Sequence, residues 1–221
     1  MGLEFRELEG RIIGCRRCPR LVAWREKVAR EKVRRFRDQE YWGRPVPAFG
    51  DPDAALVIVG LAPAAHGGNR TGRMFTGDRS GDWLYEALFR SGLAGKPESV
   101  APGDGLVLRD CLITAAVRCA PPGNKPETGE EIACRPFLIN TLAALPRLKV
   151  IVTLGDVSRR NVLKALGMKA SAGVPGHGSE TQAGPYVVLN SYHCSRLNTN
   201  TGRLTTPMFE DIFRRVREII D

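Results

Sequence analysis

The chain has 221 residues, of which 43% are hydrophobic and 26% charged, and its formal net charge is +9. This apolar content excludes an intrinsically disordered chain, because it suffices for a sizeable core. No apolar run approaches the roughly 20 residues that a membrane-spanning helix needs, and the charged start of the chain does not have the pattern of a signal peptide. We therefore expect a cytoplasmic protein.

The first 45 or so residues differ from the rest of the chain. Hydrophobic spacing predicts a short helix over residues 3–13, and Pro19 opens a second helix that leads into an Arg- and Lys-rich run ending at Arg37. That run is by default a solvated helix face, and the functional alternative is a face that contacts phosphates. The net charge leaves the same choice open for the whole chain, between a nucleic-acid partner and a soluble protein that happens to be basic.

Beyond this segment, apolar strands alternate with helices. Strands are predicted over residues 55–61, 111–117, 150–154 and 186–189, and helices over residues 81–90, 128–145, 156–166 and 207–220. Thr128 with Glu131 has the pattern of a capping box, and Asp156 is predicted to cap the following helix. The alternation predicts an α/β fold with a parallel sheet covered by helices on both faces.

Functional sites of such folds lie beyond the carboxyl ends of the strands, and the loop of residues 60–78 lies at such an end. It is rich in glycine and long, and loops of this length inside a domain are usually functional or disordered. It has neither a Walker-A ending nor a G-x-G-x-x-G pattern, so a nucleotide-cofactor loop is not predicted. Asp78, near its end, has a second interpretation as an acid at a helix N-terminus.

A second polar loop, residues 190–203, follows the last predicted strand. It is rich in side chains that bind phosphates and base edges. His193 in this loop is one of only three histidines. A lone histidine is more often structural, but one among hydroxyls, amides and arginines at the end of a strand favours a functional role.

Four of the six cysteines are spaced as metal ligands. Cys15 and Cys18 form a C-x-x-C pair, whereas Cys119 and Cys134 lie far downstream in a loop and a helix. Two close and two distant thiolates can staple an N-terminal segment to a folded core through a metal or an iron–sulfur cluster. The spread second pair suits a cubane cluster better than a zinc finger, although spacing does not exclude zinc. Cys111 lies in an apolar run and is predicted to be a buried thiol.

The chain resembles the family 5 (type b) iron–sulfur uracil-DNA glycosylases in segments that lie in the same order and span nearly its whole length: residues 15–21, 60–72, 75–78, 114–122 and 192–205. The resemblance implies a three-layer α/β/α sandwich around a four-stranded parallel sheet. It also implies a [4Fe–4S] cluster that staples the helical segment of residues 1–45 into a single domain over residues 1–221. The implied cluster ligands are Cys15, Cys18, Cys119 and Cys134.

The implied activity is that of a monofunctional DNA-repair enzyme. It would flip uracil, hypoxanthine or xanthine out of DNA and hydrolyse the N-glycosidic bond, leaving an abasic site for base excision repair. DNA containing such bases is the implied partner, and we expect a nucleoid-associated monomer without membrane contact.

The resemblance assigns roles to residues of several loops. Asp78 and His193 are the predicted catalytic residues, and His193 also donates to the base carbonyl as charge builds on the leaving base. The predicted base pocket contains Gly60, Ala62, Phe75, Asn124 and His193. The predicted DNA contacts are Asn69, Arg70, Arg196, Leu197, Asn198 and Arg203. Leu197 is the expected apolar wedge that fills the gap left by the flipped base.

Two departures from the wider superfamily refine this assignment. The run Gly60-Leu61-Ala62-Pro63 carries no polar side chain to position water, an absence that family 5 shares, so the nearest carboxylate, Asp78, is expected to position water or to stabilise the cationic sugar. The pair Ala115-Ala116 stands where stricter uracil enzymes have a polar pocket residue. This substitution predicts a roomier and less selective pocket.

Alternatives remain for single residues and for the whole chain. Phe75 has an alternative as an ordinary core residue, and Asn124 as a turn residue in Pro-Pro-Gly-Asn-Lys-Pro. For the chain, one alternative is a non-catalytic protein that binds damaged DNA and carries a structural cluster. The other is a zinc-stabilised nucleotide hydrolase.

Overall fold

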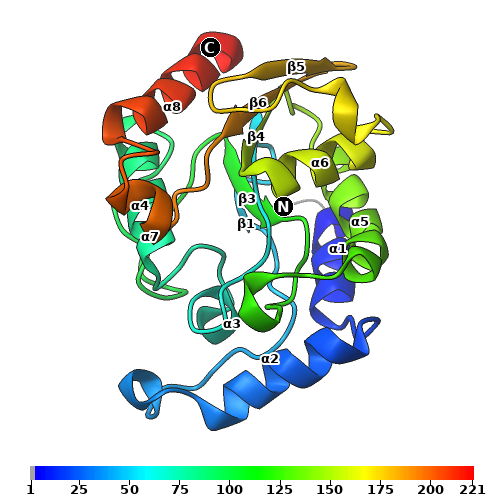
Figure 1. The fold of residues 1–221 in the computed structure, drawn as a ribbon, viewed down its shortest axis with the longest axis vertical. Helices are drawn as coiled ribbons and strands as arrows, with labels where there is room; N and C mark the ends of the chain where they lie inside the picture. The colour runs from blue at the N-terminus through cyan, green and yellow to red at the C-terminus, as the bar shows by residue number, and fades with distance from the viewer. Residues whose placement is uncertain (1–2) are drawn as a thin grey trace.

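The computed structural model describes residues 3–221 as a mixed α/β fold built on a six-stranded sheet of order β1-β3-β2-β4-β6-β5 (Figure 1). The predicted α/β class is therefore confirmed. The strands are β1 Phe49–Gly50, β2 Leu56–Gly60, β3 Cys111–Ala115, β4 Val150–Leu154, β5 Glu180–Ala183 and β6 Tyr186–Ser191.

The prediction of a sheet with only four strands is wrong. The central strands β3, β2, β4 and β6 are indeed parallel, but β1 and β5 add antiparallel edges on either side. The edge strands escape sequence patterns because β1 has two residues and β5 has four, and both are shorter than a recognisable period. β5 turns back into β6 through Gly184, whose φ of 61° lies in the left-handed region that favours glycine.

The helices are α1 Leu3–Ile13, α2 Pro19–Glu31, α3 Gly68–Thr71, α4 Arg79–Arg90, α5 Thr128–Ala143, α6 Asp156–Ala165, α7 Arg196–Asn200 and α8 Thr206–Ile220. Short 3-10 turns lie at η1 Arg34–Phe36, η2 Pro122–Asn124 and η3 Ala170–Ala172. Among the described residues, no helix is long and apolar enough to cross a membrane.

The sheet lies between two layers of helices, with α4 and α8 on one face and α1, α5 and α6 on the other (Figure 1). Successive side chains of β2 alternate between the two cores: Ile58 packs with the α4 and α8 residues Leu84 and Phe213, whereas Val59 packs with Leu138 of α5. Burial on both faces explains why β2 has an almost continuous apolar sequence.

Helix ends differ from the sequence patterns in a few places. The second helix ends at Glu31 and does not reach Arg37, because Lys32 adopts a left-handed φ of 54°. The capping box of α5 is formed by Glu127 and Glu130, one residue earlier than predicted. Asp156 is the first residue of α6 and Gly155 is its N-cap. Acidic residues remain near both N-termini, so the charge pattern was informative although the exact cap was not.

Candidate active site

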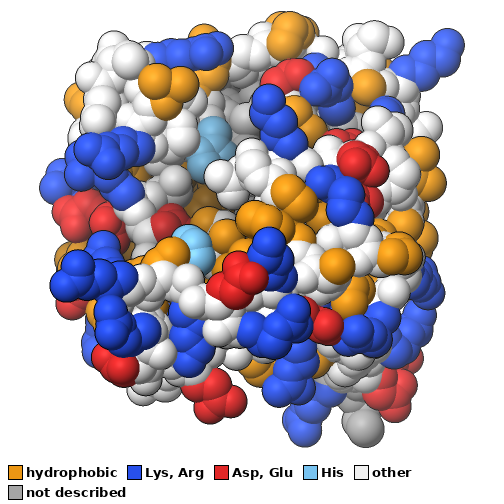
Figure 2. All heavy atoms as spheres, turned by 60° about the horizontal axis from the view of Figure 1, so that its bottom comes forward, with side chains coloured by type: hydrophobic (Ala, Val, Ile, Leu, Met, Phe, Trp, Pro, Cys, Tyr) orange, Lys and Arg blue, Asp and Glu red, His pale blue; other side chains and the backbone are white. Residues whose placement is uncertain are grey.

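The loops that follow β2, β3 and β6 meet at the carboxyl edge of the sheet and enclose a pocket of about 430 Å³. Phe75, Asp78, Asn124 and His193, which lie far apart in the chain, all line it. The structure therefore brings together the side chains that the sequence selected. Figure 2 shows a hollowed face with histidine side chains in the hollow and Lys and Arg side chains gathered around it.

Phe75 lies in this pocket with a backbone that non-glycine residues rarely adopt. Its φ is 52°, its side chain is only 7% exposed, and its ring centroid is 6.2 Å from that of His193. Two glycines make the arrangement possible, because a Cβ at Gly60 would lie 2.8 Å from the ring and a Cβ at Gly81 would lie 1.8 Å from the Phe75 carbonyl oxygen. An ordinary core phenylalanine needs no such strain, and strained residues cluster at functional sites.

Asp78 combines a structural contact with an unusual environment. Its Oδ1 accepts a hydrogen bond from the backbone N–H of Gly81 at 3.0 Å, which makes it the N-cap of α4. Its Oδ2 lies so close to Gly67 that a Cβ there would be only 2.3 Å away. Burial raises the pKa of Asp78 above the usual range of a carboxyl, although the Gly81 N–H opposes this shift. The carboxylate is thus held in a confined site beside the pocket.

His193 is fixed by its neighbours along the loop. The Asn198 amide Nδ2 donates a hydrogen bond to the His193 carbonyl oxygen at 2.8 Å. Burial lowers the pKa of His193, so the imidazole is neutral at neutral pH and presents one N–H. Asn124 is exposed at the mouth of the pocket and has a left-handed φ of 57°, which a turn residue would share.

Arg196, Leu197 and Arg203 are exposed on the loop that follows β6, and Leu197 is 72% exposed. Ser195 caps the short helix α7 by accepting a hydrogen bond from the Asn198 N–H, and Leu197 lies in the first turn of this helix. The Arg203 guanidinium lies 4.6 Å from the centre of the Tyr192 ring. An exposed leucine between two arginines is the arrangement expected of an apolar wedge flanked by phosphate contacts.

Asn69 and Arg70, predicted from the sequence as DNA contacts, lie inside the protein. Asn69 is fully buried, and Arg70 is 8% exposed. The Arg70 guanidinium donates hydrogen bonds to the His66 carbonyl oxygen at 2.7 Å and to Gln39 Oε1 at 2.6 Å. Both residues therefore support the glycine-rich loop from inside the protein, and their buried side chains are not presented to DNA.

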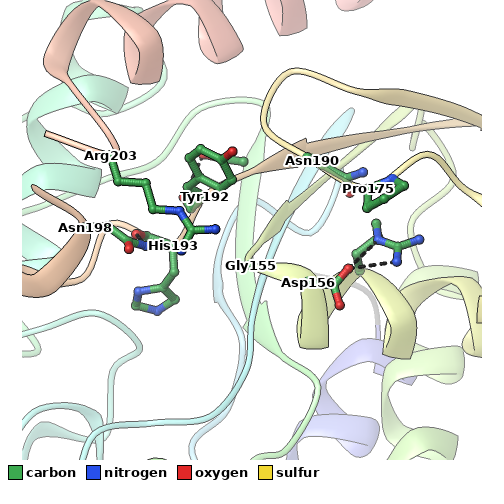
Figure 3. A pocket seen from close by; sticks show the side chains of 11 residues that line it. Gly155, Asp156, Pro175, Asn190, Tyr192, His193, Asn198 and Arg203 are labelled. Atoms are coloured by element: carbon green, nitrogen blue, oxygen red, sulfur yellow. Dashed lines mark hydrogen bonds and ion pairs between the residues drawn. The ribbon is translucent and has the colours of Figure 1, made fainter. Parts of the chain in front are cut away.

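His193 also borders a second pocket of about 470 Å³, seen from close by in Figure 3. Tyr192, Asn198 and Arg203 lie with His193 on one side of it, and Pro175 and Asp156 lie on the other. Asp156 accepts hydrogen bonds from the Arg159 guanidinium, which also holds the carbonyl groups of Ala170 and Gly173.

Several residues around the site carry only a weak signal in the sequence. Ser80, Ser195 and Arg79 line the pocket of about 430 Å³, and His177 contacts the loop that carries His193. The serines and Arg79 were recognisable only as neighbours of predicted catalytic residues. His177 lies outside both polar loops, so its rarity as one of three histidines was its only signal.

All four predicted ligand cysteines line one small cavity between α2, the loop after β3 and α5. Leu8 and Ile12 of α1 pack beside Cys15 and Cys134, and Leu21 of α2 packs beside Cys18 and Cys119. Among residues 3–221, no three or more His, Cys, Asp or Glu side chains converge closely enough to hold a single metal ion. Cys111 is fully buried in the core, as predicted.

The cysteine cavity is surrounded by buried positive charge. Arg25, 2% exposed, donates a hydrogen bond from Nη1 to Cys119 Sγ at 2.9 Å, and the Arg118 backbone N–H donates to Cys134 Sγ at 3.3 Å. Within the described part of the chain, the Nε groups of Arg25 and Arg118 are buried without a hydrogen-bond partner. The chemistry of this donor set fits an anionic group bound by the four cysteines, because a buried cation requires a negative counterpart.

The pocket combines an aromatic ring, a carboxylate and a neutral imidazole in a basic face of an α/β fold, which suits an enzyme that acts on a base of a nucleic acid. The chain belongs to the uracil DNA glycosylase superfamily, whose family model matches residues 47–217. The relationship predicted from the motifs is thereby confirmed.

Curated relatives identify the type-5 group within this superfamily. The chain is 50% identical to the type-5 uracil-DNA glycosylase of Mycobacterium tuberculosis (strain CDC 1551 / Oshkosh) over 96% of its own length and 81% of that protein. It is 49% identical to the type-5 uracil-DNA glycosylase of Thermus thermophilus over 94% of each chain. The type-5 uracil-DNA glycosylase of Pyrobaculum aerophilum is 47% identical over 96% of this chain and 91% of that one.

Proposed function

We propose that the chain releases uracil from DNA by hydrolysing the N-glycosidic bond, and that its pocket also admits the deaminated purines hypoxanthine and xanthine. The convergence of Phe75, Asp78, Asn124 and His193 on one pocket carries this proposal. The relatives named above indicate the class of reaction, and the side chains that line the pocket indicate which residue performs each part of it. Nucleoid association and a monomeric state stay predictions.

The target base must leave the duplex to reach a pocket of this kind. Leu197, exposed at the rim, fills the gap in the base stack, while Arg196 and Arg203 contact phosphates. The flipped base then stacks on the Phe75 ring, and Asn124 at the mouth offers both a donor and an acceptor to the base edge.

Bond cleavage places negative charge on the leaving base and positive charge on the sugar. The neutral His193 imidazole donates its N–H to the base carbonyl and stabilises the developing anion. The Asp78 carboxylate stabilises the oxocarbenium-like sugar or orients the attacking water, as carboxylates do in glycoside hydrolysis. Confinement of Asp78 against Gly67 keeps this charge in place before the substrate arrives.

Small apolar groups support the broader substrate range. Ala62, Pro63 and Ala64 form an apolar part of the pocket wall, and none of the three offers a side-chain hydrogen bond that would select one base edge. Selection between bases is strong only where buried polar groups are left unpaired by the wrong substrate. With apolar groups on this part of the wall, discrimination between uracil and the larger hypoxanthine or xanthine rests on polar side chains elsewhere in the pocket, such as Asn124 and His193.

The Asp78→Asn variant tests the catalytic proposal. Asparagine caps helices as well as aspartate does, so α4 should keep its start, while base release from uracil-containing duplexes should fall by about 10²-fold or more. Binding of the same duplex should persist. Asp82→Asn, which removes an exposed acid one turn further along α4, is the matched control.

Two results would contradict this proposal in different ways. An Asp78→Asn variant that releases uracil at the wild-type rate shows that Asp78 is not the catalytic carboxylate. A wild-type protein that binds the duplex but leaves no abasic site at uracil, hypoxanthine or xanthine favours the non-catalytic DNA-binding alternative.

We also propose that Cys15, Cys18, Cys119 and Cys134 hold a [4Fe–4S] cluster that joins α1 and α2 to the core. Such a cluster, when bound, supplies a rigid anionic link, and the buried Arg25 and Arg118 groups offset its charge. Cys119→Ala should lose iron, inorganic sulfide and visible absorbance, whereas Cys111→Ala, which alters a core thiol away from the cavity, should keep them. A colourless anaerobic wild-type preparation with stoichiometric zinc would reject the cluster.

A further inference from the structure

His177 joins three segments that are distant in the chain. Its Nε2 lies 3.0 Å from the carbonyl oxygen of Met208 in the first turn of α8. Its Nδ1 accepts a hydrogen bond from the backbone N–H of Tyr192 at 3.2 Å, and the Ser191 hydroxyl lies 3.4 Å from the same nitrogen. The imidazole thus ties the segment before β5 to both α8 and the end of β6.

The partners of His177 determine which nitrogen carries its proton. A carbonyl oxygen only accepts and a backbone N–H only donates, so Nε2 carries the hydrogen and Nδ1 is a bare acceptor. The two ring nitrogens therefore have separate tasks. Nε2 anchors the ring to α8, whereas Nδ1 holds the backbone of Tyr192, the residue directly before His193.

The other contacts of Tyr192 make this hold effective. Its ring lies 5.3 Å from the His177 ring with an interplanar angle of 33°, and the Arg203 guanidinium covers it at 4.6 Å. His193 is held from the other side by the Asn198 amide on its carbonyl oxygen. His177 therefore fixes the peptide group between Ser191 and Tyr192, one residue before His193, and Asn198 fixes the peptide group that follows His193.

We propose that His177 is a positioning residue for base release, acting through its Nδ1 bond to the Tyr192 N–H to hold His193 at the base carbonyl. The proposal rests on the role of His193 proposed above. His177 touches neither the substrate nor the reacting atoms in this scheme. Misplacing a group at the reacting centre by about 1 Å costs on the order of 10²-fold in rate, so a single backbone hydrogen bond is enough to matter.

Two substitutions separate the tasks of the two ring nitrogens. The Oδ1 of asparagine reaches the place of Nδ1, whereas the Nε2 of glutamine reaches the place of the imidazole Nε2. Both substitutions remove the imidazole ring and its stacking on Tyr192, so a difference between the two variants cannot come from the loss of stacking. His177→Asn keeps the acceptor for Tyr192 and should slow single-turnover uracil release by less than about 3-fold. His177→Gln keeps only the Met208 bond and should slow it by about 10–100-fold, as loss of a supporting shell does.

Hydrogen exchange supplies a readout that does not depend on activity. The Tyr192 amide should be protected in the wild type and in His177→Asn, and should exchange faster in His177→Gln. Thermal midpoints of the two variants should differ little, because each loses one hydrogen bond and the same ring. Equal rates of uracil release in the two variants would overturn the inference.

The His193→Ala variant distinguishes failure of this inference from failure of the catalytic role. If His177 acts through His193, His177→Gln adds no further loss in a His193→Ala background. Multiplicative losses in the double variant would mean that His177 acts elsewhere and would refute the positioning role. If His193→Ala alone releases uracil at the wild-type rate, the proposed role of His193 fails first, and the positioning role fails with it.

Discussion

A methyl group added at Gly60 should displace the Phe75 ring and so impair the pocket, without exposing a buried side chain or changing the charge of the protein. Gly60 lies in β2 and is not among the residues with positive φ, so alanine fits the backbone. Its Cβ, however, would lie 2.8 Å from Phe75 Cζ and 2.9 Å from Cε2. Because ordinary carbon–carbon contacts are about 3.5–4.0 Å, the ring would have to retreat by roughly 0.7–1.2 Å.

The Phe75 backbone leaves the ring little freedom to retreat, because Gly81 already touches the Phe75 carbonyl oxygen. Overpacking of this kind costs about 1–3 kcal/mol, and a shift of about 1 Å in a substrate-contacting group costs on the order of 10²-fold in rate. Single-turnover release of uracil from a duplex oligonucleotide, read by alkaline cleavage at the abasic site, measures the rate. Thermal unfolding measures the stability.

Two comparisons make the Gly60→Ala result interpretable. Gly10→Ala adds the same methyl group in α1 where nothing lies within 4 Å, and should keep the rate of uracil release. Combining Gly60→Ala with Phe75→Leu removes the ring that the methyl group strikes, so the double variant should be no slower than Phe75→Leu alone. A Gly60→Ala variant with wild-type rate and thermal midpoint would refute this account of the pocket.

Three further predictions follow from burial and exposure at the site. Burial raises the pKa of Asp78, so the folded protein keeps this proton at pH values where the unfolded chain has lost it, and the stability of the fold falls as pH rises across that window. Asp78→Asn should therefore have a higher thermal midpoint than the wild type at neutral pH, by a margin that shrinks toward about pH 4. Uracil release by the wild type should fail as acid protonates the carboxylate. Burial lowers the pKa of His193, so below about pH 6.5 the unfolded chain binds a proton on this side chain more readily than the folded protein does. The wild type should therefore lose stability toward urea as the pH falls. This loss should be smaller in His193→Ala. Leu197→Ala should leave the thermal midpoint unchanged, because the side chain is 72% exposed. It should slow uracil release from duplex DNA by about 10-fold, which is part of an unstacking cost of a few kcal/mol, and should not slow release from single-stranded DNA. Val107→Ala, at another exposed apolar residue, should slow neither.

The sequence predicted the central fold because its signals are local and strong. β2 and β4 are near-continuous apolar runs, and burial on both faces of a parallel sheet produces that pattern directly. The catalytic candidates followed from the same logic, since Asp78 and His193 lie in the loops after two such strands. Their convergence on one pocket depended only on the parallel order of the strands.

What the sequence did not predict depends on long-range contacts. Asn69 and Arg70 looked like surface residues because polar side chains in a glycine-rich loop usually are, yet Gln39 and the Arg25 carbonyl, from segments far upstream, cover them. His177 gave no local signal, because its function lies in which backbone groups its two nitrogens meet. Only the packed structure supplies those partners.

The glycines of the loop after β2 have a different use from the one that their pattern favours. Glycine next to a strand end usually lets a backbone approach a ligand, whereas Gly60 and Gly67 make room for the side chains of Phe75 and Asp78. The left-handed Phe75 costs on the order of 1–3 kcal/mol, and surrounding structure must hold it there. Since the ring and the carboxylate are seated before any base arrives, their ordering adds no cost to binding. Under the proposed function, a flipped base meets a preformed surface, and the energy of base recognition remains available for bond cleavage.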